Sequence, residues 1–179
     1  MALIARRALL TDRTAMRNLL TTVVNGQSPL QELRADYGAG ALNFTAAQLQ
    51  QCIQSGAFEV LVCHDGAPMR GWSIFAHQNG IEHIAADAWQ HAYTVTDKSL
   101  TLVNRLNVVR EIVRTACGVV DPSVHVWADV KTPGNLDTFL QGLNPNFPAF
   151  TGFPFFPVTS YGVSCNRFYE SAANIVARF

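Results

Sequence analysis

The hydrophobic and polar positions of the first 55 residues predict one strand followed by helices. Residues 2–9 form a short apolar run that is typical of a strand. Apolar side chains then recur every three or four residues, which predicts helices at about residues 11–25, 29–37 and 45–55. Polar residues that can cap a helix precede the first and third of these segments, and glycines follow them.

The pattern then changes to alternation, which predicts an antiparallel meander. Residues 58–64 and 70–78 read as two strands joined by a turn at Asp65-Gly66. Asn79-Gly80 is a strong hairpin signal and predicts a turn into a third strand within residues 81–94.

A long helix follows the meander. Its apolar face spans about residues 97–117, with Thr96-Asp97 as the expected cap and Gly118 as the end. Residues 123–130 predict a further strand and residues 135–143 a short helix.

The C-terminal segment is the least regular part of the pattern. Residues 144–161 hold four prolines, which favour an extended edge or loop, and a short strand is expected near residues 161–165. Phe168, Ala172, Ile175 and Phe179 follow at spacings of four, three and four, which predicts a final amphipathic helix.

Composition restricts the classes of protein that this chain can belong to. The chain has 179 residues, 49% of them hydrophobic, so it can bury the core of a single domain spanning residues 1–179. Only 15% are charged, and 13 basic residues balance 13 acidic ones. This balance disfavours nucleic-acid binding and favours association with other proteins. No apolar stretch is long enough to cross a membrane, and four widely spaced cysteines predict reduced thiols in a cytoplasm.

The order of these elements resembles the GNAT (Gcn5-related N-acetyltransferase) fold. IARRALLTDRTAMRNLL is similar to the first strand and helix of that family, and FEVLVCHDGAPMRGWSIFAHQ resembles its second and third strands. SVHVWADVKTPGNLDTFLQGL resembles its fifth strand and fourth helix. The resemblance implies an α/β domain with a mixed, mostly antiparallel sheet flanked by helices, to which this chain adds a C-terminal helix.

The resemblance also implies a pyrophosphate-binding loop before the long helix. GNAT enzymes have glycines in this loop, where main-chain N–H groups hold the pyrophosphate of acetyl-CoA. The matching residues 94–101 contain no glycine, and Asp97 places a carboxylate there. We therefore expect no cofactor; if acetyl-CoA binds, Thr96, Lys98 and Ser99 are the candidates to hold it.

No catalytic or metal-binding constellation stands out. On the enzyme interpretation, the resemblance makes Glu82 or His83 the candidate general base, with Asp87 as a further carboxylate nearby. The spacing of the five histidines and four cysteines predicts no metal site.

The aromatic segment suggests a surface that contacts another protein. Rigid, proline-rich chain that carries aromatic anchors suits an interface, so residues 144–179 are interpreted as an interaction extension of the domain. The expected interface residues are Phe147, Phe150, Phe153, Phe155, Phe156, Phe168, Ile175 and Phe179.

Two functions from different classes remain open at this point. The first is a non-enzymatic structural component of a bacteriophage virion, made in the host cytoplasm. VHVWADVKTPGNLDTFL resembles the small GNAT-like proteins of short-tailed phages, which implies contacts with other virion proteins or with copies of itself. The alternative is an N-acetyltransferase with a divergent cofactor loop. The missing glycines favour the first reading.

Overall fold

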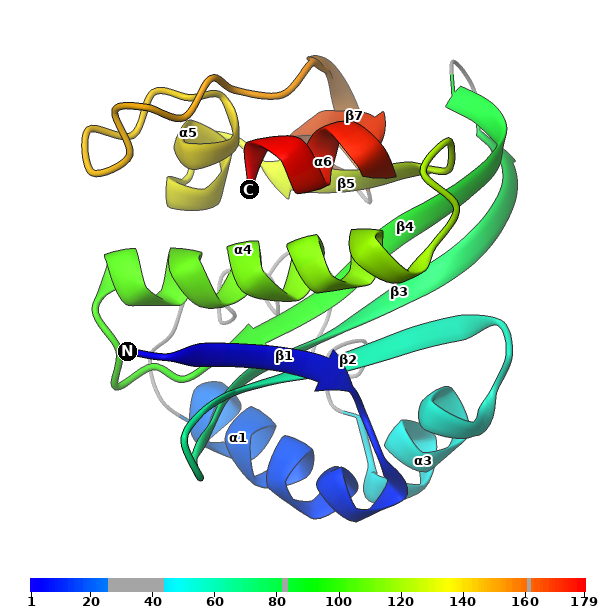
Figure 1. The fold of residues 1–179 in the computed structure, drawn as a ribbon, viewed down its shortest axis with the longest axis vertical. Coiled ribbons are helices and arrows are strands. Elements are labelled where there is room, and N and C mark those ends of the chain that lie inside the picture. Colours follow the sequence, from blue (N-terminus) through cyan, green and yellow to red (C-terminus); the bar gives the residue numbers. More distant parts are fainter. Residues whose placement is uncertain (26–43, 82–83, 161) are drawn as a thin grey trace.

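The computed structural model describes residues 1–25, 44–81, 84–160 and 162–179. Figure 1 shows the described chain as one sheet with helices on both faces, which confirms the expected α/β architecture. The strands are β1 (Leu3–Arg7), β2 (Phe58–Asp65), β3 (Met69–Ile81), β4 (Ile84–Thr96), β5 (His125–Lys131), β6 (Phe155–Ser160) and β7 (Val163–Ser171). The helices are η1 (Leu10–Asp12, 3-10), α1 (Arg13–Asn25), α3 (Ala46–Gln54), α4 (Leu102–Val119), α5 (Asn135–Leu140) and α6 (Ala172–Arg178). The helix expected at residues 29–37 lies outside the described residues.

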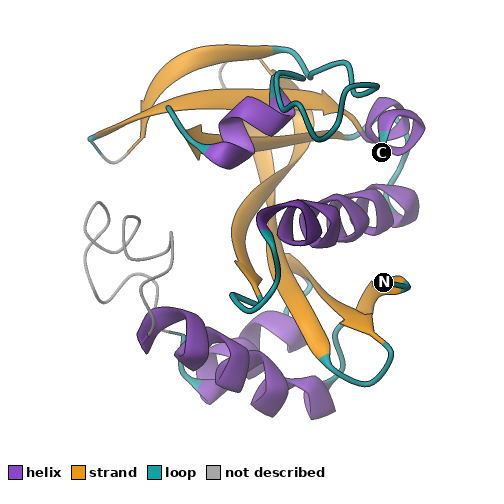
Figure 2. Cartoon of the chain, turned by 90° about the vertical axis from the view of Figure 1, so that its left-hand side faces the viewer, coloured by secondary structure: helices purple, strands orange, loops and turns teal. Residues whose placement is uncertain are grey.

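The sheet is mixed and mostly antiparallel, as the sequence predicts. Its seven described strands have the order β1-β2-β3-β4-β5-β7-β6, and β4–β5 is the parallel pair among them. Figure 2 shows the half made of β5, β7 and β6 turned away from the half made of β1 to β4.

Local signals explain why the helices begin where they do. The Thr45 hydroxyl accepts a hydrogen bond from the Gln48 N–H at 3.2 Å, and the Gln48 side chain accepts one from the Thr45 N–H at 2.9 Å. This reciprocal pair is a capping box, which satisfies two main-chain donors that a helix start otherwise leaves open. It confirms the predicted start of α3.

Each face of the sheet carries its own hydrophobic core. On one face, Met16, Leu20 and Leu49 of α1 and α3 pack on β2, β3 and β4. On the other face, α4 lies across the sheet beside α6 (Figure 1), and its apolar side packs with residues of β2, β3, β5 and β7. The two layers of helices therefore cover β2, β3 and β4 on one face and parts of β2, β3, β5 and β7 on the other.

Gly71 allows α4 to approach β3 closely. A Cβ atom at this position would lie 2.6 Å from Cγ1 of Val108 and 2.8 Å from the carbonyl oxygen of Val95. Real side chains do not tolerate such contacts, so only glycine fits here without moving α4 or the sheet. The part of α4 around Val108 can therefore lie directly against β3 at Gly71.

Two predicted boundaries in the middle of the chain are wrong. Asn79 and Gly80 do not form the turn, because β3 continues through them to Ile81, which pairs with Ile84 of β4. The long helix begins at Leu102 rather than at residue 97, since Thr96 still pairs with Gly71 in the sheet. The N-cap is Thr101, whose hydroxyl accepts a hydrogen bond from the Asn104 N–H at 3.3 Å.

The predicted final helix is also partly wrong. Residues 163–171 form strand β7, so Phe168 lies in the sheet, and only residues 172–178 are helical. β7 lies between β5 and β6 and pairs with both along most of its length. The proline-containing segment at Phe155–Ser160 forms the edge strand β6, in agreement with the expected extended edge.

The residues of the expected interface mostly lie in the core of the chain itself. Phe153, Phe168 and Ile175 are buried. Phe150 and Phe179 are partly buried in a cluster of rings, in which the centroids of Phe153 and Phe179 lie 5.1 Å apart. Phe147 and Phe156 are also partly buried, whereas Phe155 on the edge strand is 42% exposed. An interface at residues 144–179 therefore stays a prediction, and its exposed ring is Phe155.

Candidate functional site

The candidate site lies where β4 and β5 part. The two strands pair in parallel over only three positions, the last of which is Gln90 with Trp127. β4 then continues to Thr96 and β5 to Lys131 without pairing to each other. Main-chain groups that a continuous sheet would use are thus left for another partner.

β4 is also irregular at this point. Tyr93 pairs with Ile74 and His91 pairs with Phe75, so Ala92 is an extra residue opposite β3. Such a bulge bends a strand and redirects its side chains, and bulges are frequent beside functional sites. Here the bulge follows directly after the last position at which β4 and β5 pair.

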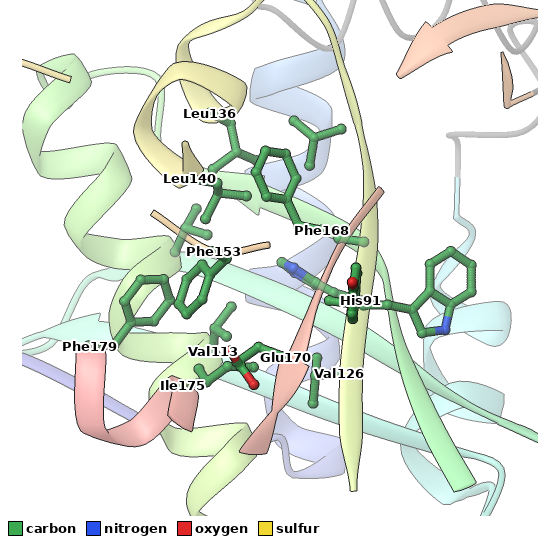
Figure 3. Close-up of a pocket in the computed structure, with 15 residues that line it drawn as sticks. His91, Val113, Val126, Leu136, Leu140, Phe153, Phe168, Glu170, Ile175 and Phe179 are labelled. Carbon is green, nitrogen blue, oxygen red and sulfur yellow. The ribbon is translucent and has the colours of Figure 1, made fainter. Parts of the chain in front are cut away.

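An apolar cavity of about 60 Å³ opens from the point of parting. His91 and Ala128, the first residues beyond the last pair, both line it. Valines of α4 and β5, leucines of α5 and rings of the C-terminal segment form most of its remaining wall. Figure 3 shows Val113, Phe153, Phe168 and Ile175 arranged around the His91 imidazole.

His91 belongs to a chain of hydrogen bonds between β3 and β4. Its Nε2 lies 3.1 Å from the hydroxyl of Ser73, which lies 2.6 Å from the hydroxyl of Thr94. Because Thr94 donates to the carbonyl of Trp72, Ser73 donates to Thr94 and His91 donates from Nε2. This order leaves the lone pair of the neutral imidazole on Nδ1.

The His91 imidazole is neutral at physiological pH. Burial lowers its pKa to about 4, since a charged imidazolium would lose its hydration among apolar side chains. The ring also stacks on Phe75, with centroids 4.6 Å apart. At the point where β4 and β5 part, the cavity wall therefore contains the polar but uncharged ring of His91.

We expect His91 to make the stability of the protein fall as the pH falls from about 6.5 to 4. In this window the unfolded chain takes up a proton on His91 at its ordinary pKa, and the folded chain does not, because its pKa is about 4. Across this window the unfolding free energy falls by about 3 kcal/mol. Urea unfolding at several pH values measures it.

The substitution His91→Gln is expected to flatten this pH dependence, because glutamine does not titrate. Gln90→Asn, next to His91 in β4, replaces no titratable group and is the control that is expected to keep the wild-type profile. An unchanged profile in His91→Gln would show that another group causes the effect.

The loop between β4 and α4 is held by its own side chains. One carboxylate oxygen of Asp97 accepts hydrogen bonds from the N–H and the hydroxyl of Ser99, at 2.9 and 2.7 Å. The other accepts from Arg70 at 2.7 Å. Burial alone would raise the pKa of Asp97, but these hydrogen bonds outweigh it and keep the pKa below its ordinary value. Asp97 is therefore an ionised and neutralised carboxylate.

The surroundings of this loop are positive overall. Arg70, Lys98 and Arg105 carry three positive charges against the one negative charge of Asp97, which leaves two. Nε of Arg70 is buried without a hydrogen-bond partner. The 18-residue helix α4 begins directly after the loop and adds the positive end of its dipole. Despite its lack of glycine, the loop suits an anion such as a pyrophosphate.

The structure places the predicted cofactor residues in this loop but gives them different roles. Thr96 is buried, and its hydroxyl accepts a hydrogen bond from Nε of Arg105 at 3.0 Å. Ser99 is bonded to Asp97, whereas the side chain of Lys98 is exposed. Lys98 is the charged residue among the three, and its side chain is exposed at the loop.

The predicted bases Glu82 and His83 lie outside the described residues. Ile84 is the first described residue after them, and it lies seven residues before His91 in β4. Because a strand rises about 3.3 Å per residue, this separation is about 23 Å. Asp87 is in β4, and its main chain pairs with Asn79. The candidate site accordingly centres on His91, which the spacing along the sequence did not distinguish from the other histidines.

Two further classes of site concern metal ions and membranes. In the described part of the chain, none of the His, Cys, Asp and Glu side chains form a group of three or more that could hold a metal ion. None of the helices in this part is both long and apolar enough to cross a membrane. The four cysteines are free thiols, and burial raises the pKa of Cys63 and Cys117 to about 12.

Comparison with known proteins defines the fold. No family model matches the sequence, and no curated protein sequence matches it. Solved structures do match: an acetyltransferase from Thermus thermophilus has a TM-score of 0.59 at 10% identity, over 96% of this chain and 97% of that one. An N-acetyltransferase from Staphylococcus aureus also has a TM-score of 0.59, at 11% identity over 96% and 99% of the two chains. Aminoglycoside 6′-acetyltransferase type Ii has the same score at 12% identity, over 94% and 97%.

These likenesses extend over nearly the whole chain and show that the fold is that of the GNAT acetyltransferases. They overturn the expectation of a virion component without enzyme activity and without a cofactor. The three structures named above are acetyltransferases, and the comparisons give no support to a phage protein. The sequence argument rested on the missing glycines and on the carboxylate of Asp97; in the structure this carboxylate is paired with Arg70.

Proposed function

We propose that this chain is an N-acyltransferase that uses acetyl-CoA or a related acyl-CoA. The observation that carries the proposal is the parting of β4 and β5 at His91, with an apolar cavity at the point of parting. The positive loop before α4 lies at the end of β4, so the two parts of the site adjoin along one strand. The likeness of the fold to that of acetyltransferases supports this function.

The residues of the chain fit such a ligand. Arg70, Lys98, Arg105 and the beginning of α4 would hold the pyrophosphate, and the buried, unpartnered Nε of Arg70 would gain a hydrogen-bond acceptor. Main-chain groups of β4 and β5 beyond their last pair would hold the pantetheine arm. When bound, acyl-CoA supplies a thioester whose carbonyl carbon an amine attacks, so that a C–N bond forms, the C–S bond breaks and the thiol takes up a proton.

The chain contributes the surroundings of this exchange. The apolar walls of the cavity keep water from the carbonyl carbon and so protect the acyl group from hydrolysis. The neutral His91 imidazole at the cavity wall offers a lone pair on Nδ1, which can accept a hydrogen bond from the attacking amine. Ser73 and Thr94 fix the orientation of that ring.

Acetyl-CoA is expected to stabilise the purified protein against heat. At an acetyl-CoA concentration ten times the dissociation constant, the unfolding free energy rises by about 1.4 kcal/mol. For a domain of this size this corresponds to an increase of about 3–6 °C in Tm. The second readout is release of free thiol when an amine is added to the complex. No shift with millimolar acetyl-CoA and none with longer acyl-CoA thioesters would contradict the proposal.

Two variants with the same loss of charge test where the phosphates bind. Lys98→Gln removes an exposed cation of the loop and is expected to weaken acetyl-CoA binding about fivefold, more at low salt than at high salt. Arg114→Gln is the matched control, because Arg114 is an exposed cation at the other end of α4, paired with Glu111 at 2.8 Å. Equal weakening in both variants would place the phosphates elsewhere.

A further inference from the structure

The cavity beside His91 is larger than an acetyl group needs. A water molecule requires about 10–15 Å³ when cavities are measured in this way, so 60 Å³ corresponds to about four or five water-sized groups. A methyl group is about the size of one water molecule. An acetyl methyl at the point of parting would therefore fill only about a quarter of the space.

The walls beyond His91 and Ala128 are apolar. Val109 and Val113 of α4 form one side, and Phe153, Ile175 and Phe179 of the C-terminal segment form another. Figure 3 shows Phe153, Phe179, Ile175 and Val113 together on one side of His91. A space with such walls favours hydrocarbon over water, since water there would lack hydrogen-bond partners.

Glu170 is the charged residue of the lining, and its charge is satisfied by neighbours. Its carboxylate accepts hydrogen bonds from the Ser171 N–H at 2.8 Å and from Asn174 at 2.9 Å, and Arg178 lies 3.4 Å away. Burial raises the pKa of Glu170, but these hydrogen bonds and the charge of Arg178 outweigh it and lower the pKa. The carboxylate is thus held at the beginning of α6 and needs no partner in the cavity.

We propose that this cavity binds the hydrocarbon part of an aliphatic acyl group of about four to six carbons, so that the enzyme prefers such an acyl-CoA to acetyl-CoA. The proposal rests on the proposed function and names the acyl donor for the same site. The thioester lies where β4 and β5 part, and the chain extends from His91 between α4 and the C-terminal segment. Each methylene that leaves water for this cavity strengthens binding about fourfold.

The test is a series of thioesters with the full-length protein: acetyl-, butyryl-, hexanoyl- and dodecanoyl-CoA, with affinities measured by calorimetry. We expect affinity to rise about fourfold per methylene up to four to six carbons and to fall again at dodecanoyl, which exceeds the cavity. If acetyl-CoA binds as tightly as butyryl- and hexanoyl-CoA, this inference is wrong and the proposed function stands. If no thioester binds, both are wrong.

A variant that fills the cavity gives an independent measurement. Val113→Phe places a ring in the space and is expected to reduce binding of hexanoyl-CoA at least tenfold while acetyl-CoA binding changes less than threefold. Val119→Phe is the matched control, because Val119 is 51% exposed at the end of the same helix. If Val113→Phe does not fold, the affinities of the wild-type protein for the four thioesters are sufficient to test the proposal. Equal loss for both thioesters in Val113→Phe would contradict the proposal.

Discussion

Deletion of residues 166–179 is expected to abolish cooperative unfolding of the whole domain. The deletion removes most of β7, which pairs with β5 from His125 to Lys131 and with β6 from Phe155 to Ser160. It also removes Phe168, Ala172 and Ile175 from the core beneath α4. Loss of three buried side chains alone costs several kcal/mol, which is comparable to the total stability of a typical domain.

Circular dichroism and a urea titration measure this effect. Val176→Ser is the matched control, because Val176 is 40% exposed on α6, so this variant is expected to unfold like the wild type. If the truncated chain still unfolds cooperatively near the wild-type midpoint, the C-terminal segment is an extension and not part of the core.

The substitution Asp137→Ala is expected to lower the unfolding free energy by about 3–5 kcal/mol. Asp137 lies in the first turn of α5 and is 3% exposed. Its carboxylate accepts hydrogen bonds from Thr132 at 2.7 Å, Gln141 at 2.9 Å and Asn166 at 2.8 Å. These donors come from the loop after β5, from the end of α5 and from β7, so alanine leaves polar groups of three segments without an acceptor.

Thermal unfolding measures this loss, which corresponds to a decrease of about 8–15 °C in Tm for a domain of this size. Asp121→Ala is the matched control. Asp121 also accepts two hydrogen bonds, from the N–H and hydroxyl of Ser123, but in an exposed turn, where water replaces them. A similar decrease in both variants would show that burial of Asp137 is not the cause.

Local signals predicted most elements of the fold. The capping residues Thr45 and Gln48 lie within four consecutive positions at one helix end, and the alternation of β2 is visible within eight residues. Asn79-Gly80 failed as a turn signal, because pairing with β4 carries β3 past it to Ile81. Thr96-Asp97 failed as a cap because Thr96 remains in the sheet and Asp97 binds Arg70 of β3 instead.

The prediction that the final helix includes Phe168 failed for a related reason. Phe168, Ala172 and Ile175 do face the same core, but they reach it from a strand and a helix that join at Ser171. Spacings of three and four residues fit a helix, and nothing local shows that residues 163–171 insert between β5 and β6. That pairing joins segments far apart in the chain, and long-range pairing overrides a local pattern.

For the candidate site, the family resemblance pointed to the loop residues Thr96, Lys98 and Ser99, whose role in binding stays a prediction. His91 could not be singled out, because its environment depends on four segments that meet only in the folded chain: β3, β5, α4 and the C-terminus. A neutral histidine beside an apolar cavity is a property of packing, and its sequence neighbours Gln90 and Ala92 carry no sign of it.

The bonds that Asp97 makes within its loop have a consequence for the thermodynamics of ligand binding. The N–H of Asp97 donates to the carbonyl of Arg70 at 2.8 Å, and its carboxylate fixes Ser99 and Arg70. The loop is therefore ordered when the protein folds and not when a ligand arrives. A glycine-rich loop lets a ligand come closer to its N–H groups but loses more conformational entropy on binding. In this chain, the donors act from a preorganised loop, so binding would depend more on charge and less on main-chain hydrogen bonds.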